Sequence, residues 1–101
     1  MQNFTANAVV VHNPHISEVS KKWVVADLTT SRKDKVDGKI VKSEWIDVKF
    51  VDDCFELAKN LKSGDVIDIL DAVQTFEKEE KINKYVLRQS VLSFRYSEST
   101  R

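Results

Sequence analysis

A chain of 101 residues has the length of one domain, and with 42% hydrophobic residues it can bury a core of its own. Sixteen basic residues balance sixteen acidic ones, so the net charge does not point to a nucleic acid, and the single cysteine excludes an intrachain disulfide. No basic segment followed by an apolar run opens the chain, and no apolar stretch approaches about 20 residues. We therefore expect a cytoplasmic protein that does not span a membrane.

Two strands are predicted in the first 30 residues. Residues 8–12 form a short β-branched run, which ends at the turn signal Asn13-Pro14. Residues 23–30 alternate, which places Val24, Ala26 and Leu28 on one face and Trp23 on the other. Residues 1–6 and 97–101 are expected to be flexible ends of a single domain.

A long polar loop is predicted at residues 31–43. It contains Gly38, and basic residues outnumber acidic ones around it. Local charge, not net charge, steers a polyanion. The basic residues that could contact phosphates are Arg32, Lys33, Lys35 and Lys42, and the alternative is that they are solvated loop residues.

A half-buried strand and an amphipathic helix follow. Residues 45–51 alternate cleanly, so Ile46, Val48 and Phe50 are predicted to face the core and Trp45, Asp47, Lys49 and Val51 to face outward. The spacing of Asp53 and Glu56 resembles a capping box, and Phe55, Ala58 and Leu61 mark one helical stripe. Gly64 is predicted to cap the end of this helix.

Two more strands complete the chain at residues 65–75 and 85–96, joined by a charged loop at 76–83. The predicted order is β-β-β-α-β-β. A helix between the third and fourth strands is typical of the five-stranded oligonucleotide- and oligosaccharide-binding barrel, the OB-fold. An all-β barrel with one helix is therefore the predicted fold class, and an α+β sheet with one helix on a face is the alternative.

These elements resemble the bacterial and phage single-stranded-DNA-binding proteins over most of the chain. The resemblance is carried by Val10-Val11, by Glu44-Trp45-Ile46-Asp47-Val48, by Phe55-Glu56-Leu57-Ala58, by Leu61-Lys62-Ser63-Gly64-Asp65 and by Val73-Gln74-Thr75. Three departures mark a divergent relative from a phage, a plasmid or a primosome. Asp71 replaces the family's fourth-strand glycine, Val51 replaces a base-stacking phenylalanine, and the chain ends without the acidic tail.

The resemblance implies binding of single-stranded DNA, largely independent of sequence, in replication, recombination or repair. It also implies a homodimer or homotetramer and contacts with replication or recombination proteins. The alternative is an OB-fold module for protein interaction or primosome assembly with weak nucleic-acid affinity. The neutral net charge, Asp47 and Val51 favour this alternative.

Single-strand binding without sequence preference needs aromatic faces for the bases and cations for the phosphates. Trp45, with Lys49 on the same predicted face, is the first stacking candidate, and the alternative is that it packs against a loop or a subunit interface. Trp23 is assigned equally to stacking or to a dimer interface. Phe76 lies near the position where the family carries an exposed aromatic residue.

Catalytic and metal-binding motifs find little support in the sequence. His12 and His15 have no cysteine at zinc spacing, and two glycines cannot build a phosphate-binding loop. Cys54 is interpreted as a buried, inert thiol. We expect no enzyme activity, no metal and no cofactor.

Overall fold

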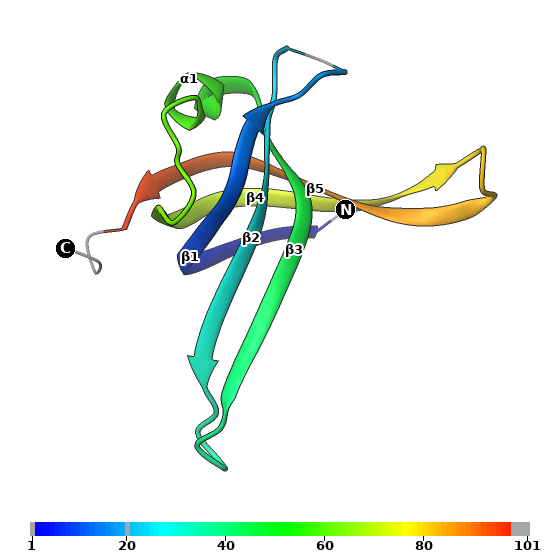
Figure 1. Ribbon diagram of the computed structural model, residues 1–101. Coiled ribbons are helices and arrows are strands. Elements are labelled where there is room, and N and C mark those ends of the chain that lie inside the picture. The colour runs from blue at the N-terminus through cyan, green and yellow to red at the C-terminus, as the bar shows by residue number, and fades with distance from the viewer. Residues whose placement is uncertain (1, 20, 98–101) are drawn as a thin grey trace.

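Five strands and one short helix form a closed barrel in the computed structural model, which describes residues 2–19 and 21–97 (Figure 1). The elements are β1 (Gln2–Ile16), β2 (Val24–Lys33), β3 (Ile40–Phe50), a 3₁₀ turn (Asp52–Cys54), α1 (Phe55–Ala58), β4 (Val66–Glu79) and β5 (Lys84–Tyr96). The order around the barrel is β1-β2-β3-β5-β4. All neighbours are antiparallel except β3 and β5, whose parallel pairing closes the barrel. The predicted OB-fold topology is confirmed.

Strand β1 is much longer than predicted and serves two neighbours. Its first part pairs with β4, from Gln2 opposite Gln74 onward, and its second part pairs with β2. Residues 2–6, expected to be flexible, are therefore part of the barrel. The two ladders meet at Val10, which pairs with Val66 of β4 and Thr29 of β2. Just before it, the β1–β4 register shifts at a bend around Ala8, whose φ is 54°. The Asp68 carboxylate accepts the Ala8 N–H at 3.0 Å and so holds this bend.

The last described residue, Ser97, is hydrogen-bonded to the barrel. The N–H of Ser97, a residue predicted to be flexible, donates to the Val66 carbonyl at 2.9 Å. Ser97 is also buried. The remaining residues predicted to be flexible, Met1 and 98–101, lie outside the described residues.

The predicted loop at residues 31–43 is mostly a two-stranded ribbon. Beyond Thr29 in β2 and before Glu44 in β3, the ladder continues to the pair Lys33–Ile40, and only residues 34–39 form the turn. We call residues 30–43 the β2–β3 arm. This ribbon projects from the barrel, and neither of its faces packs on the core. Its sequence therefore lacks the alternation of apolar and polar residues that would have predicted strands.

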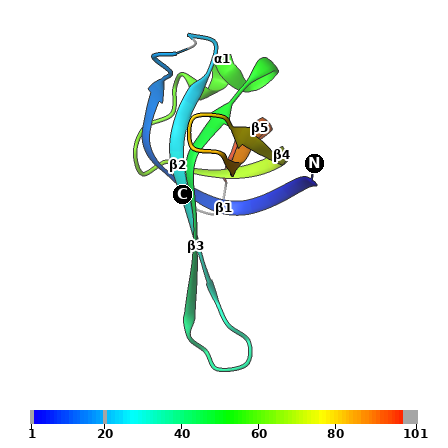
Figure 2. The same cartoon turned by 90° about the vertical axis from the view of Figure 1, so that its right-hand side faces the viewer.

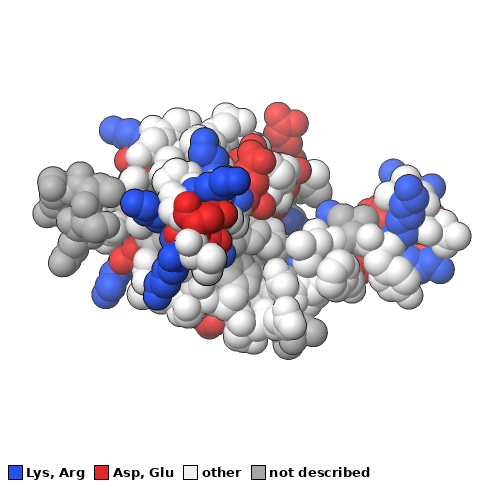
Figure 3. Space-filling model, turned by 90° about the horizontal axis from the view of Figure 1, so that it is seen from below, with Lys and Arg blue, Asp and Glu red and all other residues white. Residues whose placement is uncertain are grey.

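A second ribbon extends from β4 and β5, and we call residues 75–88 the β4–β5 arm. Its ladder runs to the pair Glu79–Lys84, so the loop predicted at 76–83 is also shorter than expected. The β2–β3 arm points downward and the β4–β5 arm to the right in Figure 1, and Figure 2 views the molecule along the β4–β5 arm. Seen from below, Lys and Arg gather on both arms among Asp and Glu, and the surface between the arms is mostly uncharged (Figure 3).

Inward-facing side chains from all five strands fill the barrel. Phe50 and Phe94 meet edge to face at its centre, with ring centroids 5.2 Å apart. The buried apolar residues of the strands are Val9, Val11, Val24, Ala26, Leu28, Val48, Phe50, Ile67, Ile69, Ala72, Val91 and Phe94. The predicted core faces of residues 24–28 and of the end of β3 are thus correct. No helix within 2–19 and 21–97 is long and apolar enough to cross a membrane.

Ala58 at the end of α1 and Leu61, three residues beyond it, cover one end of the barrel, and both are buried. The predicted stripe from Phe55 to Leu61 is only partly helical, because α1 ends at Ala58. The predicted capping box is wrong, because the segment starts with a 3₁₀ turn at Asp52 and Asp53 lies inside that turn without a side-chain cap. Gly64 is not a helix cap either. It lies beyond the end of α1, in the turn before β4, with a φ of 94°.

A β-bulge in β3 reverses the predicted alternation of its first half. Between two consecutive pairs of the β2–β3 ladder, β2 has one residue, Asp27, and β3 has two, Ile46 and Asp47. Asp47 adopts a φ of 53°, and its N–H donates to the Asp27 carboxylate at 3.0 Å. As a result, Ile46 is 58% exposed, and Trp45 lies opposite buried Leu28. The prediction that Ile46 faces inward and Trp45 outward was wrong.

The Asp68 carboxylate gives the barrel an acid-sensitive contact. The Ala8 N–H, and then the Arg95 guanidinium, hold the pKa of Asp68 below its ordinary value of 3.8. A carboxylate whose pKa is lower in the folded state than in the unfolded state stabilises the folded state. This contribution is complete at a pH above the pKa in the unfolded state, and it is lost as the pH falls through the pKa in the folded state. We expect Asp68→Asn to lower the free energy of unfolding at pH 7 and to lose this effect progressively below about pH 4.

Urea unfolding of wild type and variant between pH 3 and 7 measures this difference. Asp53→Asn, which removes an exposed carboxylate beside α1, is the control. An Asp68→Asn deficit of equal size at pH 3 and pH 7 would contradict the assigned role.

Candidate nucleic-acid interface

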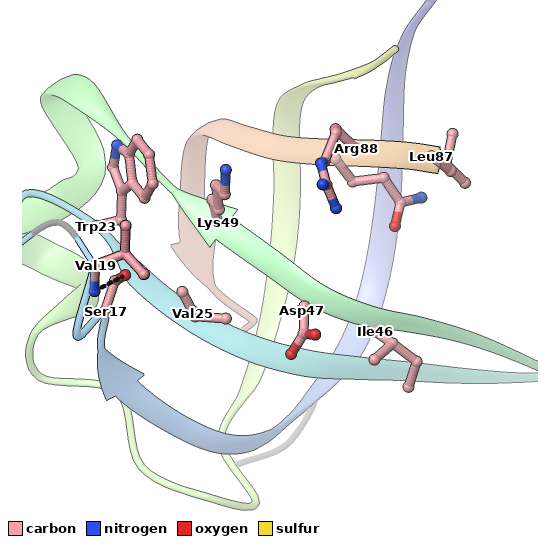
Figure 4. Close-up of a pocket in the computed structure, with 10 residues that line it drawn as sticks. Ser17, Val19, Trp23, Val25, Ile46, Asp47, Lys49, Leu87 and Arg88 are labelled. Atoms are coloured by element: carbon pink, nitrogen blue, oxygen red, sulfur yellow. Dashed lines mark hydrogen bonds between the residues drawn. The ribbon is translucent and has the colours of Figure 1, made fainter. Parts of the chain in front are cut away.

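A groove of about 520 Å³ lies on the outer face of β2 and β3. The segment before β2 borders it on one side and the base of the β4–β5 arm on the other (Figure 4). Its aliphatic lining comes from Val19, Val25, Ile46 and Leu87, and Trp23 adds an aromatic ring. Its cations are Lys49 and Arg88. We call this feature the groove.

In the groove, the aromatic ring of Trp23 and the positive charge of Lys49 lie together. In the β2–β3 ladder, Lys49 lies opposite Val25, two residues after Trp23. This register places the Lys49 Nζ 4.1 Å from the centroid of the Trp23 ring. A cation over an indole is worth about 0.5–1 kcal/mol at an exposed site. Sequence alternation placed both residues outward, and the structure brings them together.

Arg88 is the second cation of the groove, and the sequence analysis missed it. It lies on β5 next to the stretch that pairs with β3, where Ser90 is opposite Lys49. The parallel β3–β5 register therefore brings Arg88 to the groove. No local sequence signal reveals a register between segments about 40 residues apart.

The groove also contains a carboxylate. Asp47 lines it and is exposed, while its backbone N–H is fixed by Asp27. Ile46 enters the groove only because of the bulge. The outer face of β3 therefore presents an apolar, an acidic and a basic side chain within four consecutive residues.

Trp45 lies outside the groove, contrary to its predicted position beside Lys49. It is partly buried against the core and stacks on Phe4, with ring centroids 6.1 Å apart and an interplanar angle of 15°. Phe76 lies on the β4–β5 arm and is 71% exposed. Cross-strand pairing places Leu87 opposite Phe76, and Tyr85 opposite Lys78 on the same face of the arm.

The basic candidates of the predicted loop are distributed over the β2–β3 arm. Arg32, Lys33 and Lys35 are exposed near its tip. Lys42 lines a second pocket of about 390 Å³ together with His12 and the hydroxyl residues of β2. His12 Nε2 and Thr29 Oγ1 lie 2.8 Å apart there. These cations are thus not part of the groove but continue along the same two strands.

A solved structure similar to this chain is that of the small single-stranded DNA-binding protein from Streptomyces coelicolor. The match has a TM-score of 0.57 and covers 99% of this chain and 97% of that chain, at 13% sequence identity. The two chains share a fold. No protein-family model and no curated protein matches the sequence. At 13% identity this structural likeness shows the fold alone, and the ligand has to be argued from the site.

Neither a metal centre nor a reactive thiol emerges from the described residues. Within residues 2–19 and 21–97, no group of three or more His, Cys, Asp or Glu side chains could hold a metal ion. Cys54 is buried, and its thiol donates to the carbonyls of Val51 and Val91, each at 3.2 Å. Burial raises the pKa of Cys54 to about 11.

The raised pKa of Cys54 predicts that its thiol reacts slowly in the native protein. A thiol with a pKa near 11 is almost entirely neutral at pH 8, and the thiolate is the nucleophile. We expect a colorimetric disulfide reagent at pH 8 to label native protein at least about 100-fold more slowly than protein in 6 M guanidinium chloride. Comparable labelling rates in the two states would contradict the inert role.

Proposed function

We propose that this chain binds single-stranded DNA, largely independent of base sequence. The observation that carries the proposal is the groove on the outer β2–β3 face, where the Trp23 indole and the Lys49 ammonium lie together. OB-folds bind oligonucleotides on this face, between the loops that flank it. An aromatic face and a cation are the two elements that sequence-tolerant strand binding needs.

Base stacking on Trp23 would change the role of Lys49. Lys49 lies over the ring that a base would cover. A long, flexible side chain can move its ammonium from the ring to a phosphate at low cost, because the cation–π contact at an exposed site is weak. The groove is therefore suited to exchange a cation–indole contact for a base–indole contact and a phosphate–ammonium contact.

The β2–β3 arm extends this surface. Arg32, Lys33, Lys35 and Lys42 would meet the phosphates of a strand that continues along β2 and β3 from the groove. Phe76 on the β4–β5 arm offers a second exposed ring. The proposed role is to coat exposed strands in replication, recombination or repair, as a homodimer or homotetramer.

A second candidate function is an OB-fold module for protein interaction or primosome assembly. Exposed apolar side chains on the β4–β5 arm favour it, since Phe76 and Tyr85 are 71% and 72% exposed. Asp47 in the groove favours it as well, because a carboxylate repels phosphate. Binding to a replication protein without affinity for oligo-dT would decide for this candidate.

Trp23 should be the fluorophore that reports binding. Trp23→Ala is expected to lower the affinity for oligo-dT by about 1–3 kcal/mol, the typical loss for one stacked base. In Trp45→Phe, which keeps Trp23, oligo-dT should quench the fluorescence. In Trp23→Phe, which keeps Trp45, quenching should be weaker, because Trp45 already stacks on Phe4. Quenching confined to Trp45, or none in wild type, would contradict the proposed site.

Lys49 should contribute to the salt dependence of binding. Each phosphate contact with single-stranded DNA contributes about −0.7 to the slope of log K against log salt concentration. Lys49→Gln should therefore weaken binding and flatten this slope by about 0.7. Lys62→Gln, in the turn after α1, is the matched control and should leave the slope unchanged. Equal slopes for Lys49→Gln and wild type would remove Lys49 from the phosphate path.

A further inference from the structure

Two carboxylates of the β4–β5 arm hold the guanidinium that lines the groove. Arg88 Nη2 lies 3.3 Å from Glu79 Oε2, and Arg88 Nε lies 3.8 Å from Glu77 Oε2. The three side chains are between 37% and 63% exposed, so solvent and a ligand can reach them. Carboxylates and phosphates use the same donors of a guanidinium. The two glutamates therefore occupy the position that a phosphate would take.

Both cations of the groove are thus engaged by other side chains of the chain. Lys49 lies over Trp23, Arg88 is bound to Glu77 and Glu79, and Asp47 adds an exposed carboxylate. A phosphate that binds the Nε–Nη2 edge of Arg88 must displace one or both glutamates from that edge. The ion pairs stand in competition with the strand for a single guanidinium.

We propose that Glu77 and Glu79 limit the affinity of the groove for single-stranded DNA by competing with phosphate for Arg88. This inference rests on the proposed function and adds its regulation by the chain itself. Because Arg88 returns to the glutamates when a phosphate leaves, the same contacts speed release of the strand. A binding protein that must be displaced from DNA benefits from such an internal competitor.

The size of the effect follows from the exposure of the ion pairs. Exposed pairs contribute little, so two of them hold Arg88 only modestly. Removing both carboxylate charges should raise the affinity for oligo-dT about 2- to 10-fold. Salt screens exposed ion pairs, so this gain should shrink toward onefold as sodium chloride rises from about 50 to about 300 mM.

The test is a double-mutant cycle, measured by tryptophan quenching with oligo-dT. The glutamates are changed together, as Glu77→Gln with Glu79→Gln, in wild type and in an Arg88→Gln background. The expected result is a gain in affinity in the wild-type background and none in the Arg88→Gln background. Glu80→Gln, which removes an exposed charge from the turn of the same arm, is the matched control and should change the affinity by less than about 2-fold.

Three outcomes would overturn the inference. An equal gain in both backgrounds would mean that the glutamates repel DNA in general and do not act through Arg88. No gain in wild type, with oligo-dT still bound, would overturn this inference and leave the proposed function intact. No binding by wild type or by the glutamine variant would overturn both. Thermal melting of each variant verifies that it is folded.

Discussion

The bulge at Ile46 and Asp47 determines which side chains the barrel presents to a ligand. The Asp27 carboxylate fixes it by accepting the Asp47 N–H, and Asp47 tolerates the positive φ that the bulge requires. One extra residue reverses the faces of β3 beyond it. Trp45 is thereby turned toward the inner side of the sheet, and Ile46 is turned into the groove. Without the bulge, the most prominent aromatic residue of β3 would lie on the outer face.

Closure of the barrel brings β5, and with it Arg88, to the groove. The short parallel ladder between β3 and β5, with Lys49 opposite Ser90, is the contact that brings Arg88 beside the β2–β3 face. This ladder depends in turn on β4, which pairs with β5 along its whole length and with the first part of β1. The position of a cation in the groove is therefore set by the closure of the whole barrel, not by a local motif.

The sequence predicted the elements whose pattern is local, and it failed where the pattern depends on register. Alternation placed Val24, Ala26 and Leu28 in the core and Trp23 outside it, because the first three lie on one unbroken strand and Trp23 directly precedes it. The same rule failed at Trp45, since a one-residue bulge leaves no mark in the alternation of residues 45–51. Residues 31–43 and 76–83 were predicted to be loops because solvent reaches both faces of each ribbon and removes the apolar period. Arg88 could not be assigned to the site without the β3–β5 register.

Charge is distributed so that a neutral chain can still meet a polyanion. In the groove, Lys49 lies over an indole and Arg88 is paired with two glutamates. On the β2–β3 arm, by contrast, Arg32, Lys33, Lys35 and Lys42 form no ion pair within the part of the chain that the structure describes. Under the proposed function, a strand would first meet the β2–β3 arm, where no internal contact has to open. Stacking on Trp23 would then supply the free energy that opens the ion pairs of Arg88, so exposed bases and not charge alone would secure the complex.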